Sequence, residues 1–92
     1  MNERIEVIVF GRVQMVMYRD FAARKARGLG LVGEVKNLKD GTVRVVAEGS
    51  GEAIQKYVQK LQQGSLLSRV ERVSLERKPS MGDYKSFSIT YD

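Results

Sequence analysis

Apolar and polar residues alternate along several short segments of the chain, the pattern typical of β-strands. In the first of these segments, residues 4–13, Ile5, Val7 and Val9 fall on one face. The other face carries Glu6, Ile8 and Phe10, so both faces look partly covered and we expect a central strand. The same pattern predicts further strands over residues 32–38, 42–48, 70–78 and 87–91.

Two other segments repeat apolar residues every three or four positions, which is the period of an α-helix. In residues 51–63, Ser50 is the expected N-cap and Gly64 the expected residue after the last turn. The repeat there is formed by Ile54, Tyr57, Val58 and Leu61. The earlier helix is expected over residues 20–29, where Asp20 in the first turn favours the helix dipole.

The order of these elements is strand, helix, strand, strand, helix, strand, strand. Asp40-Gly41 lies between the second and third strands, and this dipeptide is a strong hairpin signal. The order predicts an α+β fold, a ferredoxin-like two-layer sandwich: an antiparallel sheet with two helices on one face, βαββαβ plus a short C-terminal strand. With 92 residues, we expect one domain over 1–92.

Composition narrows the chemistry that the chain can perform. The sequence contains no cysteine and no histidine, which excludes thiolate nucleophiles, histidine bases and the commonest transition-metal ligands. The formal net charge of +5 is a mild attraction for anions. No apolar run is long enough to span a membrane, and the N-terminus lacks the apolar core of a signal peptide, so we expect a cytoplasmic protein without a membrane partner.

The segment between the first strand and the first helix is the best candidate for a site. It reads Gly11-Arg12-Val13-Gln14-Met15-Val16-Met17-Tyr18-Arg19 and ends at the expected helix N-terminus. Backbone N–H groups at such a terminus favour an anion, and an arginine can grip a phosphate through two parallel hydrogen bonds. The segment therefore predicts a phosphate or carboxylate site around Arg19.

Three stretches of the sequence resemble the acylphosphatase family. The first is Gly11-Arg12-Val13-Gln14, followed by Val16 and by Tyr18-Arg19. The second runs from Gly33 through Asn37 and Asp40-Gly41 to Val43, and closes with Gly49. The third is Gln63-Gly64-Ser65, followed by Val70 and Val73. The three stretches span most of the chain, in order and at the family's spacings.

The resemblance implies hydrolysis of the carboxyl–phosphate anhydride of acyl phosphates to a carboxylate and inorganic phosphate, without metal, cofactor or covalent phosphoenzyme. It implies that Arg19 binds the phosphoryl group and that Asn37 holds the attacking water. The phosphate-binding loop would comprise Gln14, Met15, Val16, Met17, Tyr18 and Arg19. We favour a supporting role for the Gln14 side chain. This chemistry suits a chain without histidine or cysteine, because an acyl phosphate carries a good leaving group and phosphoryl transfer depends chiefly on positioning and charge.

Two positions depart from the family pattern. Met15 stands where the family has glycine, and a left-handed backbone there would cost a methionine about 1–2 kcal/mol. We therefore expect weaker phosphate affinity than is usual for the family. Glu34 replaces an aromatic residue; facing the site it would repel an anionic substrate, and facing outward it would matter little.

Two alternative functions follow from the same pattern. One is a non-catalytic anion-binding or interaction domain of the same fold, which Met15 and Glu34 favour. The other is an RNA-binding module, because the RNA-recognition motif has the same element order. Residues 42–48 lack the aromatic side chains on which that motif stacks bases. We therefore expect no nucleic-acid partner. The expected partner is a small acyl phosphate or inorganic phosphate, and we expect the protein to be a monomer.

Overall fold

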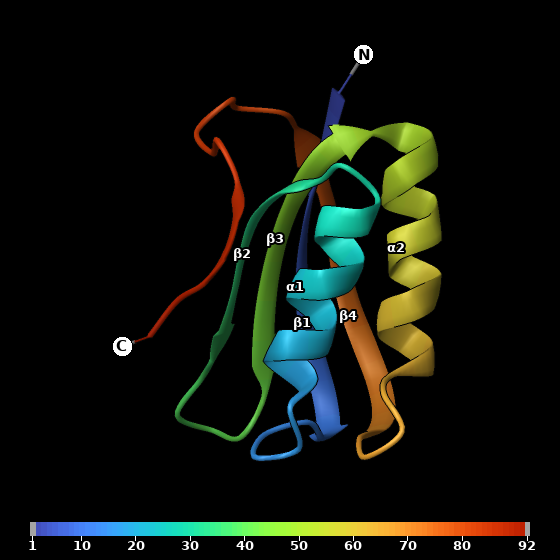
Figure 1. Ribbon diagram of the computed structural model, residues 1–92, viewed down its shortest axis with the longest axis vertical. Helices are drawn as coiled ribbons and strands as arrows, with labels where there is room; N and C mark the ends of the chain where they lie inside the picture. The colour runs from blue at the N-terminus through green and yellow to red at the C-terminus, as the bar shows by residue number, and fades with distance from the viewer. Residues whose placement is uncertain (1, 92) are drawn as a thin grey trace.

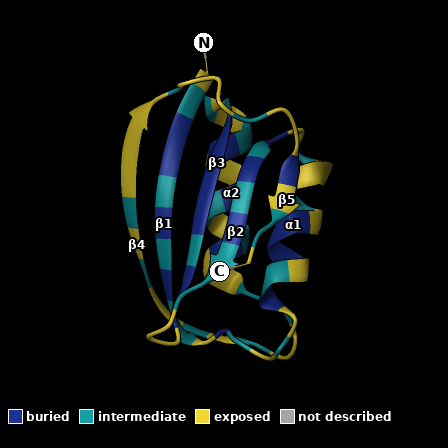
Figure 2. Ribbon diagram, turned by 90° about the vertical axis from the view of Figure 1, so that its left-hand side faces the viewer, coloured by how far each residue is buried: buried dark blue, intermediate teal, exposed yellow. Residues whose placement is uncertain are grey.

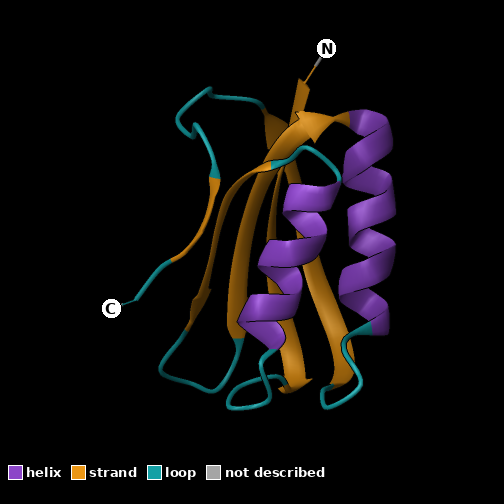
Figure 3. Cartoon of the chain, viewed as in Figure 1, coloured by secondary structure: helices purple, strands orange, loops and turns teal. Residues whose placement is uncertain are grey.

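Five strands and two helices follow one another along residues 2–91, the part of the chain that the computed structural model describes (Figures 1 and 3). They are β1 (Asn2–Arg12), α1 (Tyr18–Gly28), β2 (Val32–Asn37), β3 (Val43–Ser50), α2 (Gly51–Gln63), β4 (Arg69–Pro79) and β5 (Phe87–Ile89). Both helices lie on the same face of the sheet (Figure 1). The predicted α+β, ferredoxin-like fold is confirmed.

The strand order across the sheet is β4-β1-β3-β2-β5. The first four strands pair antiparallel, as expected, whereas β5 pairs parallel to β2 through Val35 and Ile89. The sheet is therefore mixed rather than wholly antiparallel. The reason is the route of the chain: β4 ends at one edge, and residues 80–86 cross one end of the sheet to begin β5 at the other edge.

The core lies between the helices and the face of the sheet that they cover (Figure 2). Ile5, Val7 and Val9 of β1 are almost completely buried there, and β1 pairs with strands on both sides. This confirms the central strand predicted from the pattern. The outer strand β4 is largely exposed by comparison (Figure 2).

Both predicted caps of α2 are confirmed. Ser50 Oγ accepts a hydrogen bond from the Ala53 N–H (3.2 Å), and Gly64 follows α2 with φ +75°. Helix α1 ends near Gly28, as expected, but it begins at Tyr18, two residues before the predicted start. None of the helices in residues 2–91 is long and apolar enough to cross a membrane.

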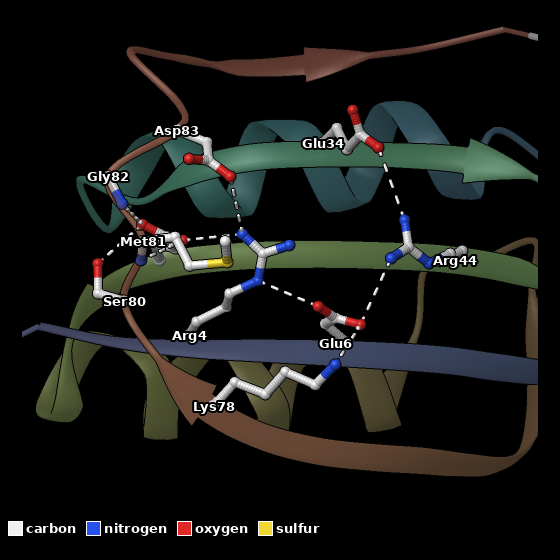
Figure 4. A network of polar contacts seen from close by, with 10 residues as sticks. Arg4, Glu6, Glu34, Arg44, Lys78, Ser80, Met81, Gly82 and Asp83 are labelled. Carbon is white, nitrogen blue, oxygen red and sulfur yellow. Dashed lines mark hydrogen bonds and ion pairs between the residues drawn. The ribbon is translucent and has the colours of Figure 1, made fainter.

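The helix-free face of the sheet carries a network of ion pairs (Figure 4). Glu6 pairs with Arg4, Arg44 and Lys78 at 3.1–3.4 Å. Arg4 also pairs with Glu48 of β3 at 3.0 Å. Charges of both signs therefore alternate across this face.

Glu48 fixes the segment that leads from β4 to β5. Its carboxylate is only 2% exposed and accepts hydrogen bonds from the Ser80 hydroxyl (2.8 Å) and from the N–H groups of Met81 and Gly82 (both 3.1 Å). Burial alone would raise the pKa of Glu48, but these hydrogen bonds and the one from Arg4 lower it to about 2. The ionised carboxylate thus holds residues 80–82 against the sheet.

Candidate active site

The candidate site lies at the end of the sheet where β1 and β2 end. Three connections meet at this end: residues 13–17 before α1, the hairpin at 38–42, and the segment at 64–68 between α2 and β4 (Figure 1). Because loops carry no regular backbone pairing of their own, they can turn N–H groups and side chains toward a ligand.

The loop before α1 has an unusual backbone. Met15 and Met17 both have φ +62°, and they are the non-glycine residues within 2–91 that adopt positive φ. At residue 15, positive φ agrees with the expectation drawn from the glycine of the family pattern, because glycine adopts this conformation readily. At residue 17, nothing in the sequence indicated a positive φ. Left-handed residues at alternate positions turn successive N–H groups to one side, which is the geometry of an anion-binding nest.

The N–H groups of this loop are available to a ligand. Within residues 2–91, none of the backbone N–H groups of residues 14–17 donates a hydrogen bond to the protein. The first backbone hydrogen bond of α1 runs from the Phe21 N–H to the Met17 carbonyl (3.1 Å). The N–H groups of residues 18–20, in the first turn, therefore have no acceptor within the helix. The helix dipole adds partial positive charge at the same point.

Arg19 lies in a cleft of about 520 Å³ beside the loop. Its guanidinium lies over the ring of Tyr91, 5.0 Å from the ring centroid. Within residues 2–91, no carboxylate lies within ion-pair distance of Arg19, so none of these residues neutralises its charge. The lining residues are Val13, Met15, Met17, Tyr18, Arg19, Asp20, Ile89 and Tyr91.

Two residues of the predicted phosphate loop direct their side chains into the protein. The Tyr18 ring is buried, and its hydroxyl donates a hydrogen bond to the Leu61 carbonyl of α2 (2.7 Å). Burial raises the pKa of that hydroxyl, so it stays protonated at neutral pH. Val16 packs against the edge of the core. These two residues can therefore offer a phosphate their backbone N–H groups but not polar side-chain atoms.

Gln14 joins the loop to the β2–β3 hairpin. Its Nε2 donates hydrogen bonds to the carbonyls of Leu38 (2.7 Å) and Thr42 (2.9 Å). The hairpin is itself closed by Asp40, whose carboxylate accepts from the hydroxyl (2.6 Å) and N–H (3.0 Å) of Thr42. These hydrogen bonds lower the pKa of Asp40. The hairpin therefore has a fixed position relative to the loop.

Asn37 is the last residue of β2, immediately before the hairpin. Its Oδ1 is buried and has no hydrogen-bond partner within residues 2–91. Asn37 does not line the cleft itself, but it lies two residues after Val35, which pairs with the lining residue Ile89 of β5. Asn37 is thus on the strand next to β5, which contributes to the cleft, and its Oδ1 accepts no hydrogen bond from residues 2–91.

Glu34 lies outside the cleft, on the helix-free face of the sheet. Its carboxylate pairs with Arg44 Nη1 at 3.7 Å (Figure 4). Of the two orientations that the sequence left open, the structure has the outward one. An anionic substrate in the cleft therefore does not meet this charge.

Tyr91 is the site residue that the sequence did not indicate. The alternation of Phe87, Ile89 and Tyr91 predicted a strand, but nothing in the sequence connected its last aromatic residue with Arg19. The connection depends on β5 lying parallel to β2 at the edge of the sheet. Sequence reasoning without that pairing had no means to find it.

Comparison with known proteins gives consistent matches over nearly the whole chain. The family model for acylphosphatase matches residues 5–89. An acylphosphatase of Methylococcus capsulatus is 41% identical over 90 residues, 98% of each chain. One of Thermus thermophilus is 51% identical over 73 residues, 79% of this chain and 83% of the relative. The crystal structure of acylphosphatase from Bacillus subtilis superposes with a TM-score of 0.94 at 38% identity, covering 97% of this chain and 99% of that one.

Proposed function

The chain belongs to the acylphosphatase family and hydrolyses acyl phosphates, and we propose that Arg19, the amides of residues 14–19 and Asn37 carry this reaction. The substrate is a small molecule, and the products are a carboxylate and inorganic phosphate. The assignment of these residues is supported by the geometry of the cleft and by the positions they hold in the sequence motifs.

The first step is binding of the phosphoryl group. Its non-bridging oxygens accept hydrogen bonds from the N–H groups of residues 14–17 and from the first turn of α1. Arg19 supplies a permanent positive charge and two parallel donors. Negative charge on these oxygens is stabilised throughout the transfer, which is the main requirement of phosphoryl transfer.

The second step is attack by water on phosphorus. The unused Oδ1 of Asn37 accepts a hydrogen bond from this water and orients a lone pair toward the phosphorus atom. The bond from phosphorus to the bridging oxygen breaks, and the electron pair leaves with the carboxylate. The proton of the water passes to a phosphoryl oxygen. The proposed reaction needs no side-chain base, metal or cofactor, because the anhydride is already activated.

The single observation that carries this assignment is the position of Arg19. An arginine without a carboxylate partner in residues 2–91 lies beside a loop whose N–H groups donate to no other described residue. A structural arginine at this place would be expected to pair with a carboxylate or a carbonyl. The positive charge of Arg19 and the neighbouring N–H groups therefore provide what is needed to bind an anion.

The test is hydrolysis of acetyl phosphate by the wild type and by Arg19→Ala, Asn37→Ala and Asn37→Asp. We expect each variant to lower kcat/KM by about 100-fold or more, the usual effect of removing a group that stabilises or positions the transition state. Asn37→Asp retains an oxygen acceptor but adds a charge that repels the substrate. Inorganic phosphate should inhibit the wild type, and Arg19→Ala should abolish this inhibition.

Two variants of matched residue type serve as controls. Arg77→Ala removes an arginine of β4 that pairs with Glu3 at the opposite end of the sheet, and Asn2→Ala removes an exposed asparagine at the start of β1. Both should hydrolyse acetyl phosphate as the wild type does. An Arg19→Ala or Asn37→Ala enzyme with the activity of these controls would overturn the assignment.

The proposal extends to the partners and location of the protein. We propose a cytoplasmic, single-domain monomer that acts on free acyl phosphates and has no membrane or nucleic-acid partner. The helix-free face, on which an RNA-recognition motif stacks bases, is covered by paired charges of both signs (Figure 4). The ring of Phe10 on β1 is already covered by the Arg72 guanidinium, 3.8 Å from the ring centroid. Failure to bind RNA at low salt would support this conclusion.

A further inference from the structure

We propose that Met15 and Met17 form an oxidation site, at which conversion to methionine sulfoxide by a peroxide weakens phosphate binding and reduction restores it. This inference rests on the phosphate binding of the proposed function and adds a means of regulation to it. Both side chains line the phosphate cleft together with Arg19. They are 99% and 67% exposed, although methionine is usually covered. An oxidant dissolved in water therefore reaches both side chains directly.

Few other side chains of this protein react with a peroxide. The sequence contains no cysteine, histidine or tryptophan, so methionine is its most readily oxidised residue type. Of the four methionines, Met1 lies outside the residues that the structure describes, and Met81, in the segment before β5, is not among the residues that line the cleft. Half of the readily oxidised side chains therefore lie at the candidate active site.

The modification is the transfer of one oxygen atom to sulfur. The thioether sulfur attacks an oxygen of hydrogen peroxide and the O–O bond breaks. The proton on the transferred oxygen passes to the departing hydroxide, which leaves as water. Sulfur is oxidised by two electrons, and the peroxide is reduced by two. The reverse reaction consumes a pair of thiols, which become a disulfide while the oxygen leaves as water, and methionine sulfoxide reductases catalyse it with one enzyme for each sulfur epimer.

Oxidation places a strong hydrogen-bond acceptor next to unused donors. A thioether is a weak acceptor, whereas the oxygen of a sulfoxide is polar and carries partial negative charge. The N–H groups of residues 14–17 donate to no other described residue, and within residues 2–91 no carboxylate lies within ion-pair distance of Arg19. Sulfoxide oxygens on the loop therefore compete with the phosphoryl oxygens for the same donors, and their partial negative charge repels those oxygens.

The folded state should tolerate oxidation at these two positions. Neither Met15 nor Met17 belongs to the buried core. In a core, the change from an apolar to a polar side chain disrupts packing, whereas a polar oxygen on an exposed side chain stays in water. A loss of phosphate affinity without a comparable loss of stability therefore distinguishes this site from general oxidative damage.

The test measures phosphate affinity before and after treatment with hydrogen peroxide. Wild type, the double variant Met15→Leu/Met17→Leu and the control Met81→Leu are each compared with their own untreated sample, so that the effect of the substitution itself cancels. In the wild type, oxidation should raise the inhibition constant of inorganic phosphate by about twofold to tenfold, the effect of losing one net hydrogen bond. Met81→Leu should respond as the wild type does. The double variant, which keeps Met1 and Met81, should not respond.

Met81→Leu is the matched control, because Met81 is 63% exposed, close to the value for Met17, but lies outside the cleft. Peptide mass mapping should find the added oxygen at residues 15 and 17 of the oxidised wild type. Treatment with methionine sulfoxide reductases and a thiol should return the inhibition constant to its original value. A readout without turnover is the rise in Tm that phosphate causes, which should shrink on oxidation while the Tm without phosphate changes little.

The outcomes separate the oxidation site from the proposed function. Unchanged phosphate affinity in a wild type that is oxidised at residues 15 and 17 would overturn the oxidation site and leave the proposed function intact. An equal loss of affinity in the double variant would also overturn the oxidation site, because the loss would then come from another residue. A wild type whose phosphate binding depends on oxidation as expected, but which does not hydrolyse acyl phosphates, would overturn the proposed function alone.

Discussion

Replacing Met15 by glycine should stabilise the protein. Met15 has φ +62°, which costs an ordinary L-residue about 1–2 kcal/mol and costs glycine nothing. The Met15 side chain is 99% exposed, so its removal forfeits almost no apolar burial. Glycine also makes the unfolded chain more flexible, which offsets about 0.4–1 kcal/mol of the gain. The expected net gain in the free energy of unfolding is about 0.5–1 kcal/mol.

The assay is thermal unfolding of wild type and Met15→Gly under identical conditions. For a domain of this size, 1 kcal/mol corresponds to a change in Tm of about 4–8 °C. We therefore expect Met15→Gly to raise Tm by about 2–8 °C. Denaturant unfolding should give the same gain with an unchanged dependence on denaturant concentration, because the surface exposed on unfolding is nearly the same.

Two further variants isolate the contribution of the backbone. Met15→Ala removes the long side chain but keeps the Cβ atom, so its Tm should stay near that of the wild type. Met81→Gly removes an exposed methionine whose φ is not positive, and it should lower Tm because only the unfolded state changes. If Met15→Gly melts at or below the wild-type temperature, or if Met15→Ala gives the same gain, strain at residue 15 is not the cause.

The same variant tests whether Met15 weakens phosphate binding. A strained loop leaves its binding conformation more readily, and a ligand that requires a partly populated state binds with reduced affinity. We expect the inhibition constant of inorganic phosphate to be a few-fold lower for Met15→Gly than for the wild type. An unchanged constant together with a raised Tm would mean that the strain lowers stability without affecting the site.

Three other predictions concern residues that support the site. Glu48→Gln should lower the free energy of unfolding at pH 7 by about 2–3 kcal/mol. The folded-state pKa of Glu48 is lowered to about 2, so its contribution to wild-type stability is present above pH 4.5 and is lost as the pH falls toward 2. In denaturant titrations, the stability of the variant should therefore depend less on pH in the acid range. Gln14→Leu should lower the free energy of unfolding by about 1–2 kcal/mol, because it removes the two hydrogen bonds that join the loop to the hairpin next to Asn37. It should also lower kcat/KM on acetyl phosphate, and a normal kcat/KM would contradict this role. Tyr91→Ala should lower kcat/KM about twofold to fivefold, because it removes the ring beside the Arg19 guanidinium. Tm should change little, because Tyr91 is 74% exposed. Tyr91→Phe keeps the ring and should have wild-type activity.

Local signals in the sequence were sufficient for most of the fold. Alternation with period two placed the strands, and the apolar repeat of residues 51–63 placed α2 between its predicted caps. Asp40-Gly41 predicted the hairpin, because few residues other than glycine adopt the φ of +93° that Gly41 has. The position of Arg19 at a helix N-terminus followed in the same way from a change in hydrophobic period, with an error of two residues in the start of the helix.

The remaining features depend on contacts between distant parts of the chain. The parallel pairing of β5 with β2 is set by the route of residues 80–86 around the end of the sheet, which no local pattern indicates. The stacking of Tyr91 on Arg19 follows from that pairing. The left-handed conformation of Met17 also escaped prediction, because methionine carries no local preference for positive φ. The nest needs it, so here the tertiary structure overrides the residue's own preference.

The short strand β5 is held in place by residues at the opposite end of the sheet from the cleft. This strand has only three residues, so its pairing with β2 is a weak hold on its own. Glu48 fixes the segment that precedes it, and Arg27 of α1 donates two hydrogen bonds to the Phe87 carbonyl at its start (2.9 and 3.1 Å). Ile89, the last residue of this strand, and Tyr91, two residues later, line the cleft beside Arg19. The buried carboxylate of Glu48, at the opposite end of the sheet from the cleft, therefore fixes the segment that leads to the ring beside Arg19.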